Sequence, residues 1–201
     1  MSVPVMRGRD QFHRYRGAIM FLSRLVGALP RRCRLRLLER FRKTRGKKGL
    51  AARYILMKTL ARACGDNVAV FPDVYLLNPH NISIGSNVSI QPMCYIEGGD
   101  STDPAHGVFI GNDVSIAHGC TLIPGNHISS DLSLPIKDQG VARGAIHISS
   151  NVWFGARVIV LANVNVAEGC ILAAGAVLTK STIENGVYAG VPAELIKKRG
   201  D

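Results

Sequence analysis

The feature that most constrains this chain is an apolar repeat with a period of six, which runs through residues 63–193. In its cleanest part a large apolar residue recurs at every sixth position, at Ile148, Phe154, Val160, Val166, Leu172 and Leu178. A helix with 3.6 residues per turn cannot keep such positions on one face. The repeat therefore predicts a solenoid in which short strands turn every six residues and three strands complete one coil.

The positions three residues after each apolar start carry the chemistry of tight turns. Glycine, asparagine and aspartate tolerate the left-handed backbone conformation that such turns use. These residues are Asn67, Asp73, Asn87, Asp113, Gly119, Gly125, Asn151, Asn163, Gly169 and Gly175, whereas Met93 and Arg157 depart from the preference. The regular turns support stacked coils, because one coil alone could not bury its apolar face.

Extra residues interrupt the repeat at three places. It slips before Ile84, slips again between Ile96 and Ile110, and breaks between Leu122 and Ile148. The last break predicts a loop over residues 128–147 inside the repeat domain. Loops of this length in compact folds are usually functional or disordered, so this loop is a candidate functional element.

Residues 1–62 differ from the repeat and predict an α-helical, basic N-terminal segment. They carry 18 lysines and arginines against 2 acidic residues, whereas the rest of the chain carries 7 against 12. This segment could cap the open end of the solenoid, with its cations facing solvent. It could instead lie on an anionic membrane surface. No nucleic-acid-binding motif accompanies the charge, so we expect no nucleic-acid partner.

Cysteine usage and hydropathy bear on the compartment. The five cysteines are an odd number without a CxxC pair, and favour neither a disulfide framework nor a zinc knuckle. The most apolar N-terminal stretch, residues 17–29, contains Arg24 and is shorter than the ~20 residues of a membrane-spanning helix. We expect a cytoplasmic protein, with peripheral contact at the inner face of the membrane left open.

Several segments together resemble one family. Repeats that match its signature lie at 84–88, 110–114 and 154–158. The more specific segments are Gly-Asn-His at 125–127, Pro-Ile-Lys-Asp-Gln-Gly at 135–140, Asn-Val-Trp-Phe-Gly-Ala at 151–156, Ala-Ala-Gly-Ala-Val-Leu-Thr-Lys at 173–180 and Ala-Gly-Val-Pro-Ala at 189–193. Through them the chain resembles the hexapeptide-repeat acyltransferases, in particular the maltose and galactoside O-acetyltransferases and their relatives in surface-polysaccharide assembly.

The resemblance implies an all-β left-handed parallel β-helix over residues 63–193, followed by a C-terminal tail at 194–201. It implies a homotrimer with active sites between subunits, acetyl-CoA as co-substrate, and direct transfer of acetyl to a sugar hydroxyl of a surface polysaccharide, lipopolysaccharide or glycan precursor. Two alternatives remain: an N-acetyltransferase acting on a nucleotide-linked amino sugar, and a non-catalytic β-helix scaffold with a membrane-binding basic segment.

His127 is the candidate catalytic base. It ends the last hexad before the long loop, where a rigid wall meets a flexible segment. A sugar hydroxyl is a poor nucleophile near neutral pH, and a neutral imidazole can take its proton as the oxygen attacks a thioester. The family's catalytic histidine matches this position. The alternative is a histidine that only fixes the loop to the coil.

The resemblance also assigns an oxyanion donor and a coenzyme site. The backbone N–H of Ala156 matches the oxyanion donor, although Ala156 could equally be an ordinary turn residue. The positions that match coenzyme A contacts are Trp153, Gly155, Ala156, Ala174, Thr179, Lys180 and Lys197. The two lysines would meet phosphates, and Trp153 could instead pack against the loop. Glu194 departs from the family, which often has a basic residue there.

The acceptor side rests on Tyr95 and Glu97, which match the family's acceptor region, and on Asp131. Asp131 could hold the ring of His127, contact the acceptor, or be an exposed loop carboxylate. Related β-helices with three histidines are carbonic anhydrases. His118 and His127 lie nine residues apart and lack the close histidine spacing of that family, so we expect no metal.

Overall fold

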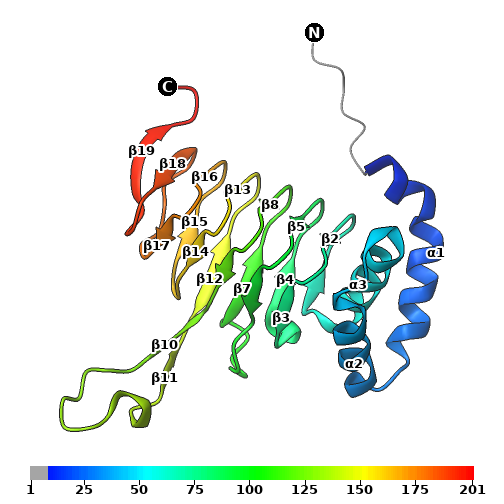
Figure 1. The fold of residues 1–201 in the computed structure, drawn as a ribbon, viewed down its shortest axis with the longest axis horizontal. Helices are drawn as coiled ribbons and strands as arrows, with labels where there is room; N and C mark the ends of the chain where they lie inside the picture. Colours follow the sequence, from blue (N-terminus) through cyan, green and yellow to red (C-terminus); the bar gives the residue numbers. More distant parts are fainter. Residues whose placement is uncertain (1–8) are drawn as a thin grey trace.

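The computed structural model describes residues 9–201, with side chains from residue 12 onward, so residues 1–8 of the predicted N-terminal segment lie outside it. Three helices come first, namely α1 (Arg9–Gly27), α2 (Arg31–Arg42) and α3 (Gly46–Leu60). Pro30, which has no backbone N–H to donate, separates α1 from α2. The helices gather at one end of a row of short strands (Figure 1).

The strands form three walls, here called A, B and C, of a parallel β-helix. Wall A holds β1 (Ala63–Cys64), β4 (Ile82–Ile84), β7 (Gly107–Ile110), β12 (Ala145–Ile148) and β15 (Asn165–Val166). Wall B holds β2 (Ala69–Val70), β5 (Ser89–Ile90), β8 (Ser115–Ile116), β13 (Trp153–Phe154), β16 (Ile171–Leu172), β18 (Gly186–Ala189) and β19 (Glu194–Lys198). Wall C holds β3 (Tyr75–Leu77), β6 (Tyr95–Glu97), β9 (Thr121–Leu122), β14 (Ile159–Val160) and β17 (Val177–Leu178).

Each coil takes one strand from each wall, and the sequence repeat sets its length. Trp153 in β13 pairs in parallel with Ile171 in β16, and the interval from 153 to 171 equals three hexads. Where the repeat is interrupted, the extra residues leave the coil as the 3₁₀ turn η1 (Pro79–Asn81), the insertion 98–107, and a segment between β9 and β12. The solenoid of parallel strands predicted from the repeat is confirmed.

The corners between walls use the predicted turn residues. Every predicted turn position except Gly125 has a positive φ, for example Asn87 at 59° and Gly175 at 75°. Met93 and Arg157 adopt the same conformation, with φ of 62° and 58°, although neither side chain favours it. The geometry of the corner therefore prevails over residue preference. Gly125 differs because the chain leaves the coil there and enters a strand.

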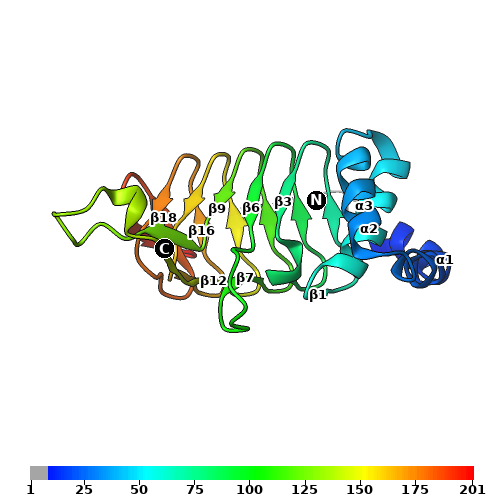
Figure 2. The same cartoon turned by 90° about the horizontal axis from the view of Figure 1, so that it is seen from below.

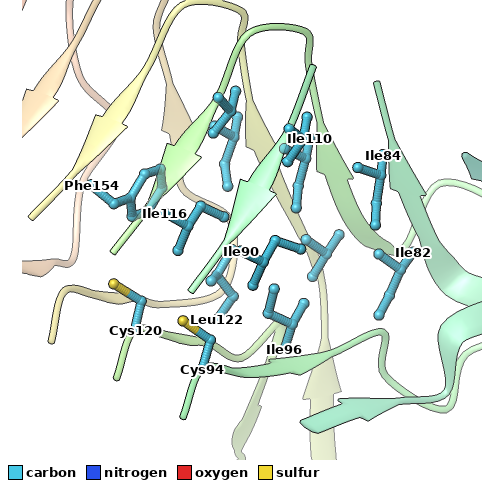
Figure 3. Close-up of a cluster of buried hydrophobic side chains, with 14 of the residues drawn as sticks. Ile82, Ile84, Ile90, Cys94, Ile96, Ile110, Ile116, Cys120, Leu122 and Phe154 are labelled. Atoms are coloured by element: carbon cyan, nitrogen blue, oxygen red, sulfur yellow. The ribbon is translucent and has the colours of Figure 1, made fainter. Parts of the chain in front are cut away.

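The core consists of one apolar stack along each wall. In wall B, Ile90 pairs with Ile116 and Ile116 with Phe154, and all three side chains are at most 1% exposed. Figure 3 shows these side chains on successive strands, with Cys94 and Cys120 beside them. Burying one such apolar side chain stabilises a fold by about 1.5–3 kcal/mol, so the stack holds adjacent coils in register. The buried cysteines take part as small apolar residues.

A hairpin arm, residues 125–143, projects from the solenoid between β9 and β12. Its strands β10 (Gly125–His127) and β11 (Val141–Arg143) pair antiparallel, and η2 (Ile136–Asp138) lies between them. The arm differs from the predicted loop 128–147, because the chain is already back in wall A at Ala145, paired with Gly107. Residues 194–198 of the predicted tail form β19, which lies antiparallel to β18.

Helix α3 covers the open end of the first coil (Figure 2). Three of its side chains donate to backbone carbonyls there: Arg53 Nε to Val70 (2.8 Å), Tyr54 Oη to Gly65 (3.0 Å) and Lys58 Nζ to Cys64 (2.7 Å). Buried backbone acceptors are costly when they lack a partner, so these contacts stabilise the exposed end. The capping interpretation therefore applies to α3. No helix within residues 9–201 has the length and hydropathy needed to cross a bilayer.

Candidate active site

His127 is the last residue of β10 and pairs with Val141 across the arm. Its side chain is exposed, and no hydrogen bond to it occurs among the residues that the structure describes. Leu122 at the end of β9 is fully buried, and Pro124 starts the departure of the chain from wall C. A rigid wall thus carries an accessible imidazole on the first strand of the arm.

The base of the arm is tied to the solenoid by two contacts. The N–H of Gly144 donates to the carbonyl of Pro124 at 2.8 Å. Arg143 makes a bidentate ion pair with Asp100 of the 98–107 insertion, with Nε to Oδ1 at 2.7 Å and Nη2 to Oδ2 at 3.0 Å. The hydrogen bond from Arg143 lowers the pKa of Asp100 below its ordinary value. Arg143 was not predicted from the sequence, because neither it nor Asp100 lies on a repeat position.

A small pocket lies at this base and connects the predicted acceptor residues with the arm. Its lining includes Glu97, Asp100, Pro124, Gly125 and Arg143. Glu97 accepts a hydrogen bond from the hydroxyl of Tyr95 at 3.3 Å. Glu97 therefore lines the same pocket as Gly125 of β10, the strand that carries the candidate base. Tyr95 is linked to this pocket by its hydrogen bond to Glu97.

Asp131 lies further along the arm and is engaged in its local turn. Its Oδ1 accepts hydrogen bonds from the N–H and Oγ of Ser133, at 2.8 and 2.6 Å, and these bonds lower the pKa of Asp131. Its backbone is bonded to the side chain of Gln139 in both directions. No contact between Asp131 and His127 occurs within the described chain, so the structure does not bring these two predicted residues together.

The predicted coenzyme residues gather at another corner, where wall B turns into wall C. Trp153 in β13 is 54% exposed. At Gly155 the next coil comes so close that a Cβ would lie 2.5 Å from the backbone nitrogen of Ala174. The Ala156 carbonyl accepts a hydrogen bond from Gly175 at 2.8 Å, whereas its N–H has no acceptor among residues 9–201. This free N–H is what an oxyanion donor requires.

The remaining predicted coenzyme residues are exposed near the C-terminal end of the solenoid. Thr179 and Lys180 follow β17 and face solvent. Lys197 lies in β19, where its Nζ donates to the Asp201 carbonyl at 3.2 Å. Glu194 starts the same strand and is exposed. Two lysines are thus accessible to an anionic ligand on this part of the surface.

Wall topology separates these groups within one chain. His127 leaves from the corner between walls C and A, because it follows β9 and precedes β12. Ala156 and Ala174 lie at the corner between walls B and C. The candidate base and the candidate oxyanion donor therefore stand at two different edges of the solenoid.

Three other histidines of the solenoid contact groups away from this site, whereas His118 is exposed at a corner. His106 Nδ1 contacts Ser101 Oγ at 2.8 Å, and the ring of His147 stacks on Phe109 with centroids 4.5 Å apart. His80 Nδ1 contacts Arg31 at 2.8 Å. Within the part of the chain that is described, no three histidine, cysteine, aspartate or glutamate side chains group as a metal site.

Known proteins are similar to this chain in sequence and in fold, although no protein-family model matches it. It is 31% identical to the galactoside O-acetyltransferase of Escherichia coli over 147 residues, covering 73% of this chain and 68% of that protein. It is 33% identical over 90 residues to a Mycobacterium tuberculosis protein named as a probable acetyltransferase, covering 45% of this chain but 30% of that longer protein.

A solved structure of a hexapeptide-repeat-containing acetyltransferase from Vibrio cholerae, complexed with acetyl coenzyme A, has the same fold. Its TM-score is 0.72 at 22% identity, covering 85% of this chain and 87% of that one. The walls, corners and hexads described above agree with this likeness. The chain therefore belongs to the hexapeptide-repeat acetyltransferases, on their galactoside O-acetyltransferase branch.

Proposed function

We propose that this protein transfers the acetyl group of acetyl-CoA to a sugar hydroxyl of a surface polysaccharide, lipopolysaccharide or glycan precursor, with His127 as general base. The observation that carries the proposal is an exposed, unpartnered imidazole on an arm whose base is fixed to a rigid wall. The relationship to galactoside O-acetyltransferase supports the choice of a sugar hydroxyl as acceptor.

In the proposed reaction His127 takes the proton of the acceptor hydroxyl as its oxygen attacks the thioester carbonyl. The resulting tetrahedral intermediate carries a negative oxygen, and the free N–H of Ala156 would donate to it. When the C–S bond breaks, the protonated imidazole returns its proton to the departing thiolate of coenzyme A. Acetyl and proton are thus both accounted for without a covalent enzyme intermediate and without a metal.

The acceptor and the donor would approach from different sides. Tyr95 and Glu97 would bind the sugar, and this assignment is supported by the position of Glu97 in the pocket at the arm base. Coenzyme A would lie along Trp153, Gly155 and Ala174, with its phosphates near the exposed cations Lys180 and Lys197. Asp131 contributes through the shape of the arm, because Ser133 and Gln139 occupy its polar groups.

The separation of the two corners supports a site shared between chains. His127 and Ala156 stand on different edges of one solenoid. In a homotrimer with a left-handed solenoid, the C–A corner of one chain would face the B–C corner of its neighbour. We therefore include the homotrimer in the proposal, with one active site at each interface.

The test compares wild type with His127→Ala in acetyl-CoA binding by calorimetry and in acetyl transfer to a glycan pool by mass spectrometry. We expect binding to persist and turnover to fall by about 10²–10⁴-fold, because only proton transfer is lost. His13→Ala, which removes an exposed histidine on α1, is the matched control and should retain activity.

Two results would contradict the proposal. Full activity in His127→Ala would remove this residue as base, while leaving the acetyltransferase assignment intact. Absence of acetyl-CoA binding in wild type would favour the non-catalytic scaffold. The chemistry of the product separates the ester from the amide: an acetyl group that resists mild alkali would identify an amino sugar as the acceptor.

A further inference from the structure

Helix α1 has two apolar faces, and only one of them is covered. The inner face packs against the core, which includes buried side chains of α3, through Phe12, Ile19, Met20 and Val26. Beside it a second apolar row, here called the outer stripe, faces solvent: Tyr15, Ala18, Phe21, Leu22 and Leu25 on α1, continued by Leu29 in the turn after the helix. An amphipathic surface helix needs only the first row, so the second row requires a separate explanation.

The outer stripe is continuous and strongly exposed. Apart from the adjacent Phe21 and Leu22, its members recur three or four positions apart, so that they are neighbours on one helical surface. Phe21 is 61% exposed and Leu25 is 55% exposed. In Figures 1 and 2 α1 is the outermost helix, at the end of the molecule away from the arm. The stripe therefore presents large apolar side chains at one extreme of the protein.

Positive charge surrounds this stripe. Arg14 and Arg24 on α1 are exposed, and Arg31 and Arg32 follow in the first turn of α2. The N-terminal segment 1–62 as a whole carries 18 lysines and arginines against 2 acidic residues. A second copy of the same segment would bring like charges together, whereas an anionic surface would neutralise them.

We propose that α1 lies flat in the interface of an anionic lipid bilayer. The outer stripe would enter the boundary between headgroups and acyl chains, while Arg14 and Arg24 contact lipid phosphates. Aromatic and leucine side chains on one face with arginines beside them are the pattern of interfacial helices. Electrostatic attraction to anionic headgroups adds to the burial of the apolar row. This inference is independent of the proposed acetyl transfer.

The experiment is flotation of the full chain with vesicles of phosphatidylglycerol and phosphatidylcholine, compared with phosphatidylcholine alone. Wild type should float with the anionic vesicles only, and less at high salt because surface charges are then screened. Joint replacement Phe21→Ser and Leu25→Ser should lower the partition coefficient by at least about tenfold, because two large apolar groups no longer enter the lipid. Joint replacement Arg14→Gln and Arg24→Gln should abolish the preference for anionic lipid.

The matched control is Leu132→Ser, which removes a 98% exposed leucine from the arm at the other end of the molecule and should leave flotation unchanged. Melting temperatures of all variants verify the fold. The proposal is overturned if wild type does not bind anionic vesicles, or if the Phe21/Leu25 variant binds as wild type does. It is also overturned if that variant forms a smaller oligomer in solution than wild type does, since a second copy of the chain would then cover the stripe.

Discussion

Arg53 offers a direct test of how the open end of the solenoid is stabilised. This arginine is 1% exposed. It donates from Nε to Val70 at 2.8 Å, and from Nη1 to the carbonyls of Phe41 and Thr44 at 2.7 Å each. Burial lowers its pKa, and no carboxylate forms an ion pair with it in the described chain. The replacement Arg53→Met keeps most of the volume but removes every donor.

The expected loss of stability follows from these three bonds. A buried carbonyl left without a donor costs about 1–3 kcal/mol, which applies most to Val70, whereas the Phe41 carbonyl keeps the Thr44 N–H at 3.1 Å. Part of this cost is offset, because a buried guanidinium is expensive to desolvate and its Nη2 already lacks a partner. We expect a net decrease of about 3 kcal/mol in the free energy of unfolding. For a chain of this size that corresponds to roughly 6–12 °C in melting temperature.

Urea denaturation of wild type, Arg53→Met and Arg53→Lys measures this effect. The lysine variant should fall between the other two, because one ammonium group cannot reach all three carbonyls. Arg36→Met removes the same charge from an exposed position on α2 and should change stability little. A loss below about 1 kcal/mol in Arg53→Met would refute the reasoning, since the carbonyls would then have found other donors.

Two further predictions concern the first coil and the coenzyme corner. Burial alone would raise the pKa of Asp66, but Arg16 at 2.9 Å and Lys58 at 3.2 Å outweigh it and hold the pKa below the ordinary value. The stability that this carboxylate contributes is therefore complete above about pH 4 and lost as the pH falls further, and unfolding curves of Asp66→Asn should lack this loss. Gly155→Ala should cost about 1–3 kcal/mol and weaken acetyl-CoA binding in calorimetry, because its Cβ meets the next coil at 2.5 Å. Gly17→Ala, which has open space around it within α1, should lower neither, because alanine favours the helix.

The regular part of the fold was predictable because it repeats. Asn87 and Gly175 mark corners in the sequence and occupy corners in the structure, with positive φ. Arg157 does not mark one, yet it adopts the same conformation because adjacent coils fix the position of the turn. Gly125 carries the signal but lies in β10, since the chain leaves the repeat at that point. Period and position thus predict corners better than residue type does.

The site was less predictable because its contacts join segments outside the repeat. The ion pair between Arg143 and Asp100 links residues 43 positions apart, and no periodic pattern relates them. Asp131 stands four residues after His127, which suggested a partner for the ring, but Ser133 lies two residues further and forms the shorter local turn. Proximity in sequence is therefore a poor guide within the arm, where hairpin pairing sets the neighbours.

The topology gives a physical reason why an acetyltransferase of this fold would need more than one chain. Each wall is a stack of paired strands over a buried apolar core, so two corners of the same coil cannot approach each other without breaking that pairing. His127 and Ala156 stand at two such corners. The arm lengthens the reach of the chain, yet His127 lies at its base, where Gly144 and Arg143 fix it to the wall. Neither group can move toward the other within one solenoid. Assembly of several chains would therefore bring His127 of one chain to the acetyl-CoA thioester held beside Ala156 of another.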